Sequence, residues 1–132
     1  MKKLTIDSSV IVASLLDNEP RHEEAFRIWE SVLSGVNSAI MPYSIFVEVV
    51  AAVKRRTGSE QLSREVMREL RKIENIAFVD LDSKAAEEAA EIAIRTGTRG
   101  MDALVIQVAK DFGSELITFD EEMIEKAKTV FE

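Results

Sequence analysis

The sequence predicts an α/β fold in which helices cover both faces of a short parallel β-sheet. Two observations lead to this prediction. Short apolar runs alternate along the chain with longer segments whose apolar residues recur at helical spacing. Polar residues, glycine or proline stand at the boundaries between these segments, where strands and helices commonly end. Strands that are separated by helices usually pair in parallel and are then buried on both faces.

The first half of the chain is expected to contain two strands and four helices. The segment after the first strand is too long and too unbroken to be another strand without a turn, so we expect a helix there. Farther along, Gly35, Pro42 and Gly58 mark the ends of elements. The expected strands are 3–6 and 38–41, and the expected helices are 8–16, 21–33, 44–56 and 59 to about 73.

The second half of the chain is expected to complete the sheet. Asp82 is placed to cap a helix that ends at Gly97, and Gly113 follows the next helix. The expected strands are 76–81, 116–119 and a brief last one at 129–131, and the expected helices are 82–97, 100–112 and 121–128.

Composition limits the class of protein. A chain of 132 residues, of which 46% are hydrophobic, suits a single folded domain over 1–132. The formal net charge of −7 argues against binding of nucleic acid through overall positive charge, although a nuclease that collects acids around metal ions is compatible with it. Asp7 and two serines interrupt the apolar run behind Met1, so we expect no secretory signal. Without cysteine or a stretch of transmembrane length, we expect a cytoplasmic protein that stays out of the membrane.

Two carboxylates follow predicted strands directly. Asp7 interrupts the first apolar run, and Asp120 comes immediately after the strand at 116–119. In a parallel sheet the binding crevice lies beyond the carboxyl ends of the strands, so an acid at this place is a candidate ligand. Asp120 also fits a capping box formed by Thr118 and Glu121, in which it would be an ordinary acid of the first helical turn. The sequence leaves both roles of Asp120 open.

Two further carboxylates lie on predicted helices. Glu48 is the sole charged residue between Pro42 and Lys54, on an otherwise apolar helix. Alternatively, it is an acid of the first turn that the helix dipole favours. Asp102 lies on the helix face that should point inward, and its alternative role is N-cap of that helix after Gly100.

Convergence of these acids would create a metal site. Asp7, Glu48, Asp102 and Asp120 would repel one another at one sheet edge unless cations lay between them. Ligand sets made of oxygen select hard ions, so we expect Mg²⁺ or Mn²⁺ rather than zinc. The single histidine, His22, excludes a mechanism that needs two histidines, and we expect it to be solvated.

Four motifs resemble those of a known family. The segments DSSVIVA, IFVEVVAA, MDALVIQVA and LITFD stand in the order and at the spacing found in PIN-domain ribonucleases, especially the VapC-like toxins of type II toxin-antitoxin pairs. The resemblance implies a three-layer α/β/α sandwich with a short parallel sheet of four to five strands. It also implies a Mg²⁺- or Mn²⁺-dependent endoribonuclease, a cognate antitoxin protein as partner, and a homodimer.

The resemblance assigns roles to individual residues. Its acidic triad corresponds to Asp7, Glu48 and Asp102, and its usual fourth acid corresponds to Asp120. Two hydroxyl residues join this catalytic set by the same resemblance, namely Thr118 and Ser8. The glycines of 96–101 are the one departure noted, and they should make the entry to the third motif mobile.

Basic residues near the acids are candidates for RNA contacts. We expect Arg55, Arg56 and Arg99 to bind the substrate, because they follow Glu48 or precede Asp102 closely in the sequence. A second basic stripe on the helix after Ser59 is interleaved with glutamates at salt-bridge spacing, which favours a solvated face over an RNA path.

Two other classes of protein are weighed against this one. A phospho-acceptor receiver domain is also an α/β unit of similar length, and Asp80 would be its acceptor. That class requires an acidic pair after the first strand, whereas Asp7 is followed by serines. The other class is a non-catalytic PIN-like module that works by binding RNA or protein, against which the complete set of acids argues.

Overall fold

The computed structural model describes residues 1–131, which form four strands and seven helices. The strands are β1 (Lys3–Ile6), β2 (Ser38–Pro42), β3 (Ile76–Val79) and β4 (Glu115–Ile117). The helices are α1 (Ser8–Leu15), α2 (His22–Leu33), α3 (Tyr43–Thr57), α4 (Glu60–Lys72), α5 (Ser83–Thr96), α6 (Gly100–Phe112) and α7 (Glu121–Phe131). None of these helices is long and apolar enough to cross a membrane.

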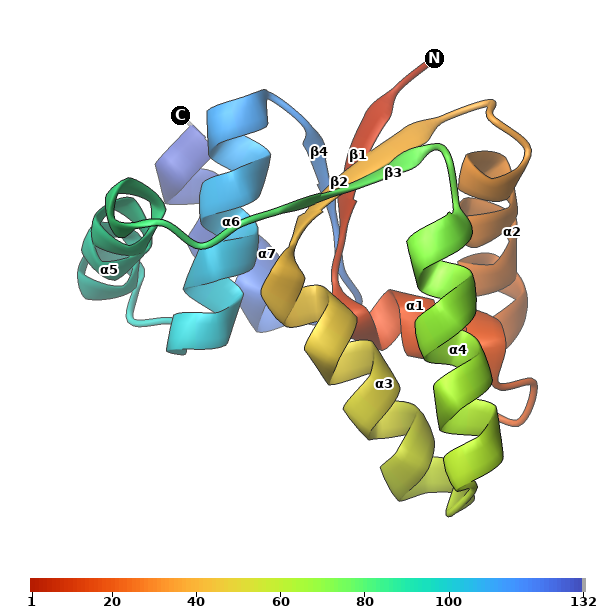
Figure 1. Ribbon diagram of the computed structural model, residues 1–132. Coiled ribbons are helices and arrows are strands. Elements are labelled where there is room, and N and C mark those ends of the chain that lie inside the picture. The colour runs from red at the N-terminus through yellow and green to blue at the C-terminus, as the bar shows by residue number, and fades with distance from the viewer. Residues whose placement is uncertain (132) are drawn as a thin grey trace.

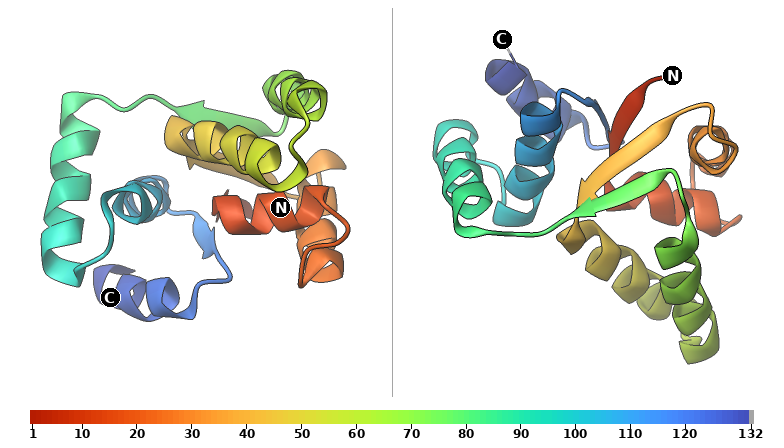
Figure 2. Two further views of the ribbon diagram at one scale, coloured as in Figure 1. Left: turned by 90° about the horizontal axis from the view of Figure 1, so that it is seen from below. Right: turned by 45° about the horizontal axis from the view of Figure 1, so that its top comes forward.

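The four strands form one parallel sheet in the order β3-β2-β1-β4. Helices α5, α6 and α7 lie on one side of this sheet, and α1, α2 and α4 lie on the other (Figures 1 and 2). The predicted three-layer α/β/α sandwich is therefore confirmed. All strands end at the same edge, the lower one in Figure 1, and α3 projects from that edge at the end of β2.

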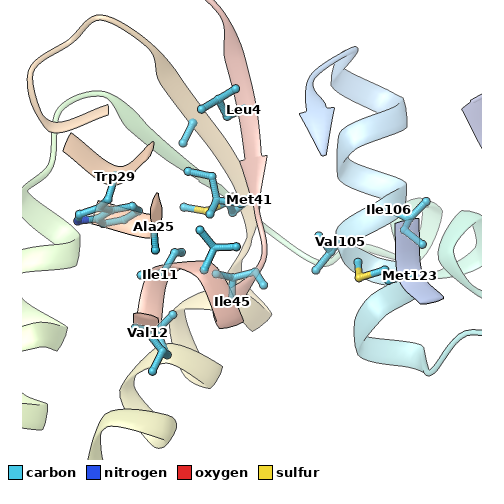
Figure 3. Packing of buried hydrophobic residues seen from close by; sticks show 14 of the residues in the cluster. Leu4, Ile11, Val12, Ala25, Trp29, Met41, Ile45, Val105, Ile106 and Met123 are labelled. Atoms are coloured by element: carbon cyan, nitrogen blue, oxygen red, sulfur yellow. The ribbon is translucent and has the colours of Figure 1, made fainter. Parts of the chain in front are cut away.

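The core lies on both faces of the sheet (Figure 3). On one face, Trp29 of α2 packs with Ile11 of α1 and with Met41 of β2. On the other face, Ile106 of α6 lies beside Met123 of α7. The central strand β1 is buried on both faces, as parallel strands usually are. This burial fixes the position of the residue that follows β1.

The expected fifth strand is absent from the described residues. Residues 129–131 continue α7, whose buried side chains Met123, Ala127 and Val130 recur at helical spacing. The β-branched and aromatic residues at the end of the chain suggested a strand, but packing of this apolar stripe decides for a helix.

Two smaller expectations have different outcomes. Asp82 caps α5 as predicted, since its Oδ1 accepts a hydrogen bond from the Ala85 backbone N at 2.8 Å. The expectation that His22 is merely solvated is wrong. Its Nδ1 lies 2.6 Å from the carbonyl oxygen of Ala13, which ties the start of α2 to α1.

The packing of α6 against the sheet predicts a large effect on stability. Ile106 is fully buried, so Ile106→Ala should lower the free energy of unfolding by about 2–5 kcal/mol through the cavity it leaves. Ile94 of α5 is 77% exposed, and Ile94→Ala should change the free energy of unfolding by less than about 0.5 kcal/mol. Urea denaturation of both variants checks this, and similar losses at the two sites would contradict the placement of α6.

Candidate active site

Asp7 is held in place at the junction of β1 and α1. Its backbone N donates to the carbonyl oxygen of Ile117 at 2.9 Å, which extends the pairing of β1 with β4. Its Oδ1 accepts from the Ser8 backbone N at 2.9 Å, so Asp7 is the N-cap of α1. Its Oδ2 accepts from the hydroxyls of Ser9 at 3.2 Å and Thr118 at 3.0 Å. The carboxylate is only 8% exposed and has one defined orientation.

Thr118 links Asp7 to Asp120. The same Thr118 hydroxyl that donates to Asp7 accepts a hydrogen bond from the Asp120 backbone N at 3.2 Å. Asp120 Oδ1 in turn accepts from the backbone N atoms of Glu122 at 3.0 Å and Met123 at 3.2 Å. Asp120 itself therefore caps α7, and the alternative of a capping box that begins at Thr118 is excluded. This capping occupies one oxygen of the Asp120 carboxylate.

Glu48 lies on α3, beyond its first turn, which contains no acid. The alternative role as a first-turn acid is therefore excluded. Among the described residues, Glu48 has no hydrogen-bond or ion-pair partner, although its side chain is half-buried. Burial, followed by the negative charges of Asp7 and Asp102, raises the pKa of the Glu48 carboxyl above its usual value, and Arg55 offsets part of this.

Asp102 lies in the first turn of α6, whose N-cap is Arg99. The alternative role of Asp102 as N-cap is therefore wrong. Like Glu48, it is half-buried and has no hydrogen-bond or ion-pair partner within residues 1–131. Burial, then the negative charges of Asp7 and Asp120, raises its pKa, whereas Arg99 and Lys126 act in the opposite direction.

The structure thus brings the four predicted acids into one electrostatic cluster. Glu48, Asp102 and Asp120 line an open cavity of about 960 Å³, and Asp7 lies behind it with its charge acting on Glu48 and Asp102. The other walls come from α5, α6 and α7 and from the connections on both sides of α5. Their residues include Leu81, Ala86, Ala90, Gly97, Arg99, Met101, Glu122 and Lys126.

The arrangement of the four carboxylates limits how a metal ion could bind. Among residues 1–131, no three histidine, aspartate or glutamate side chains are gathered closely enough to hold a metal ion directly. Mg²⁺, however, keeps several of its waters and is commonly bound through only one or two carboxylates. The unpartnered carboxylates of Glu48 and Asp102, which repel their neighbours, fit a hydrated ion of this kind. They do not fit zinc, whose sites are built mainly on histidine and cysteine.

Comparison with known proteins identifies the family. A family model described as PIN domain matches residues 4–129 of the chain. The chain belongs to the PIN domain family. Among solved structures, it is similar to VapC20 from Mycobacterium tuberculosis, which is described as a toxin that cleaves the sarcin-ricin loop. The two chains are 19% identical with a TM-score of 0.78, and the match covers 94% of each, so the fold is shared. No curated protein matches the sequence.

Membership of the PIN domain family removes the receiver-domain alternative. The sheet order agrees, because β1 here lies between β2 and β4, whereas in flavodoxin-like receivers the first strand lies between the second and the third. Asp80, the acceptor in that alternative, is exposed beyond β3.

The predicted basic residues of this PIN domain differ in their surroundings. Arg55 acts on Glu48 and Arg99 on Asp102 through their charges, and neither has an ion-pair partner among the described residues. Arg56 forms an ion pair with Glu19 instead. Arg64 of the second basic stripe pairs with Glu60, which agrees with a solvated face.

The sequence analysis did not predict two residues that contact or influence the acids. Ser9 donates to Asp7, although serine was considered only at position 8. Lys126 reaches the acids from α7, and its spacing from Glu122 gave only the signal of an ordinary surface ion pair. Neither the capped turn at Asp7 nor the approach of α7 to α6 is visible in local sequence patterns.

The repulsion within the cluster predicts the pH dependence of stability. In metal-free protein, the folded-state pKa of Asp102 lies above its unfolded value, so the folded state binds the extra proton. Its contribution to stability is present below the unfolded pKa and is lost as pH rises through the folded one. Asp102→Asn should therefore melt at the same or a higher temperature than the wild type at neutral pH in EDTA. This difference should shrink toward about pH 4.

Melting curves in EDTA across this pH range measure the effect. Asp80→Asn makes the same chemical change at an exposed position and should leave the pH profile unaltered. A Asp102→Asn protein that melts well below the wild type at neutral pH would show that Asp102 stabilises the fold.

Proposed function

We propose that this PIN domain is a metal-dependent endoribonuclease that hydrolyses RNA phosphodiester bonds. The observation that carries this proposal is the pair of half-buried, unpartnered carboxylates of Glu48 and Asp102. They line an open cavity together with Asp120. Burial and the charges of neighbouring acids, Asp7 among them, raise their pKa values, and a cation in the cavity would offset this repulsion. Buried acids without partners are costly to a fold, so their presence supports a functional role.

Of the four predicted ligands, Glu48 and Asp102 would hold a hydrated ion directly, and Asp7 and Asp120 would act on it through its waters. A bound Mg²⁺ or Mn²⁺ ion would supply Lewis-acid chemistry, polarising the scissile phosphate and activating the attacking water. Thr118 and Ser9 keep Asp7 in one orientation by their hydroxyls, and Ser8 does so by its backbone N.

Proton transfer is assigned to the same acids. Glu48 has no hydrogen-bond or ion-pair partner among the described residues, so its carboxylate is free to accept a proton from the attacking water. Glu48 thus serves as the general base in this proposal. The hydroxyl of Ser8, half-buried beside Asp7, completes the proposed catalytic set.

Single-stranded RNA would reach the cavity along its basic rim. Arg55 and Arg99 stand next to Glu48 and Asp102 without ion-pair partners among the described residues, so their guanidinium groups can contact phosphates. Arg56 contributes to the same rim only when its pair with Glu19 opens.

We further propose that the protein is the toxin of a type II toxin-antitoxin pair and acts in the cytoplasm as a homodimer. Its fold matches that of VapC20, a protein described as a toxin, over nearly the whole of both chains. The cognate antitoxin would place an arginine or lysine in the acidic cavity, because a cation is what Glu48 and Asp102 lack.

The proposed chemistry predicts the ends of the products. Purified protein with Mg²⁺ or Mn²⁺ should cleave RNA to leave 5′-phosphate and 3′-hydroxyl ends, because water rather than the 2′-hydroxyl is the nucleophile. Glu48→Gln and Asp102→Asn should each lower the cleavage rate by at least about a hundredfold. Mass spectrometry of the fragments and gel assays measure both effects.

Several outcomes would reject this function. Fragments with 2′,3′-cyclic phosphate, or full cleavage in EDTA, would contradict a metal-activated water. RNA binding without any cleavage would instead favour the non-catalytic interaction module.

The basic rim makes a separate prediction about RNA affinity. Arg55→Ala and Arg99→Ala should each weaken RNA binding and reduce the slope of log K against log salt by about one. Their melting temperatures should change little, since both side chains are exposed. Arg64→Ala removes the same charge from a residue paired with Glu60 on α4, and it should leave RNA affinity nearly unchanged. Fluorescence anisotropy at several salt concentrations tests this, and equal losses for all three variants would refute the proposed rim.

A further inference from the structure

Lys126 is a basic residue inside the wall of the active-site cavity. It lies on α7, and its Nζ is 2.7 Å from Oε1 of Glu122, one helical turn earlier. The Lys126 side chain is 33% exposed, whereas Glu122 is 74% exposed. Both side chains line the cavity, and the lysine is the more buried of the two.

The charge of Lys126 acts on Asp102, one of the acids that the mechanism uses. Together with Arg99, it counteracts the rise in the pKa of Asp102. Lys126 and Arg99 are the basic residues that line the cavity in the described part of the chain. They come from two different elements, α7 and the connection between α5 and α6, so an anion in the cavity would meet positive charge from both.

The ion pair between Lys126 and Glu122 is weak enough for another anion to replace the glutamate. An ion pair one turn apart on a helix, with one partner largely in water, contributes little to stability. The next pair on the same helix shows the contrast. Lys128 is 59% exposed and pairs with Glu125, away from the acids, beside the hollow next to β4. Only the first of these two lysines is placed to meet a ligand of the active site.

We propose that Lys126 is a phosphate-binding residue of the RNA site, which Glu122 holds in place until a phosphate of the RNA replaces it. This inference rests on the proposed ribonuclease function. The Lys126 side chain lines the cavity beside Asp102, and a phosphate oxygen there is a charged acceptor that can take the place of the exposed Glu122 carboxylate. The contact adds to those of Arg55 and Arg99 from another side of the site.

The experiment measures RNA affinity in a protein that does not cleave. Binding of a labelled single-stranded RNA of about 12 nucleotides is followed by anisotropy in the Asp102→Asn background at several salt concentrations. Lys126→Met keeps most of the aliphatic stem and removes the charge, and it should weaken binding roughly tenfold while lowering the salt slope by about one. Lys126→Arg should retain most of the affinity. Lys128→Met removes an equal charge from the same helix and should have little effect.

A second pair of variants tests the role of Glu122. Glu122→Gln should tighten RNA binding, because it removes the competing acceptor, and this gain should disappear when Lys126 is already Met. Glu125→Gln is the matched control at the other ion pair. This cycle remains informative even where Lys126→Met lowers the melting temperature, since Glu122→Gln alters only an exposed carboxylate.

The outcomes separate this inference from the function on which it rests. If wild-type protein cleaves RNA with Mg²⁺ but Lys126→Met and Lys128→Met bind RNA equally well, Lys126 is not a phosphate contact. If Glu122→Gln also tightens RNA binding in the Lys126→Met protein, phosphate does not replace Glu122 at Lys126. The increase in affinity would then come only from the removal of a negative charge. If the wild type neither binds nor cleaves RNA, the proposed function itself fails.

Discussion

The position of Asp7 is the constraint on which the site depends. This residue ends the central strand, continues its pairing with β4 through a backbone hydrogen bond to Ile117, and caps α1. Its carboxylate also accepts a hydrogen bond from the hydroxyl of Thr118, which lies just beyond β4. One residue therefore joins β1, β4 and α1 at the carboxyl edge of the sheet. The direction of α7 follows, because Thr118 also binds the backbone N of Asp120, the residue that caps this helix.

The remaining acids show the opposite balance between fold and function. Glu48 and Asp102 satisfy no backbone group and have no hydrogen-bond or ion-pair partner in the described chain, so only nearby basic side chains offset part of the cost of their partial burial. Asp7 and Asp120, by contrast, are used by the fold as caps. A site whose acids serve both purposes is anchored by two of them and reactive through the other two. Loss of stability at Glu48 and Asp102 is then the expected counterpart of their chemistry.

Most elements could be predicted because their signals are local. Hydrophobic periodicity and glycine at helix ends identified the helices, and the parallel order of strands placed Asp7 and Asp120 at one edge. Glu48 and Asp102 lie on helices, and the resemblance to PIN-domain ribonucleases joined them to this site. Two predictions were wrong because tertiary contacts determine the structure there. Residues 129–131 belong to α7 because Val130 packs into the core. His22 contacts the carbonyl oxygen of Ala13 instead of being fully solvated. Lys126 was not predicted as part of the site for the same reason, namely that its position depends on a tertiary contact. Its pair with Glu122 is evident from spacing, but the face that α7 turns to the cavity depends on the packing of Met123 and Ala127.

Charge placement explains how a chain with a net charge of −7 can suit an RNA substrate. The positive charges that matter stand beside the acids, Arg55 next to Glu48, and Arg99 and Lys126 next to Asp102. Before any ligand binds, these groups offset part of the repulsion among the carboxylates. On the proposed function, a metal ion would take over that task and leave the basic side chains to the phosphates. Binding of metal and of RNA would then favour each other, and by linkage the two effects would be equal in free energy. The acidic surface elsewhere would repel RNA that is not directed to this cavity.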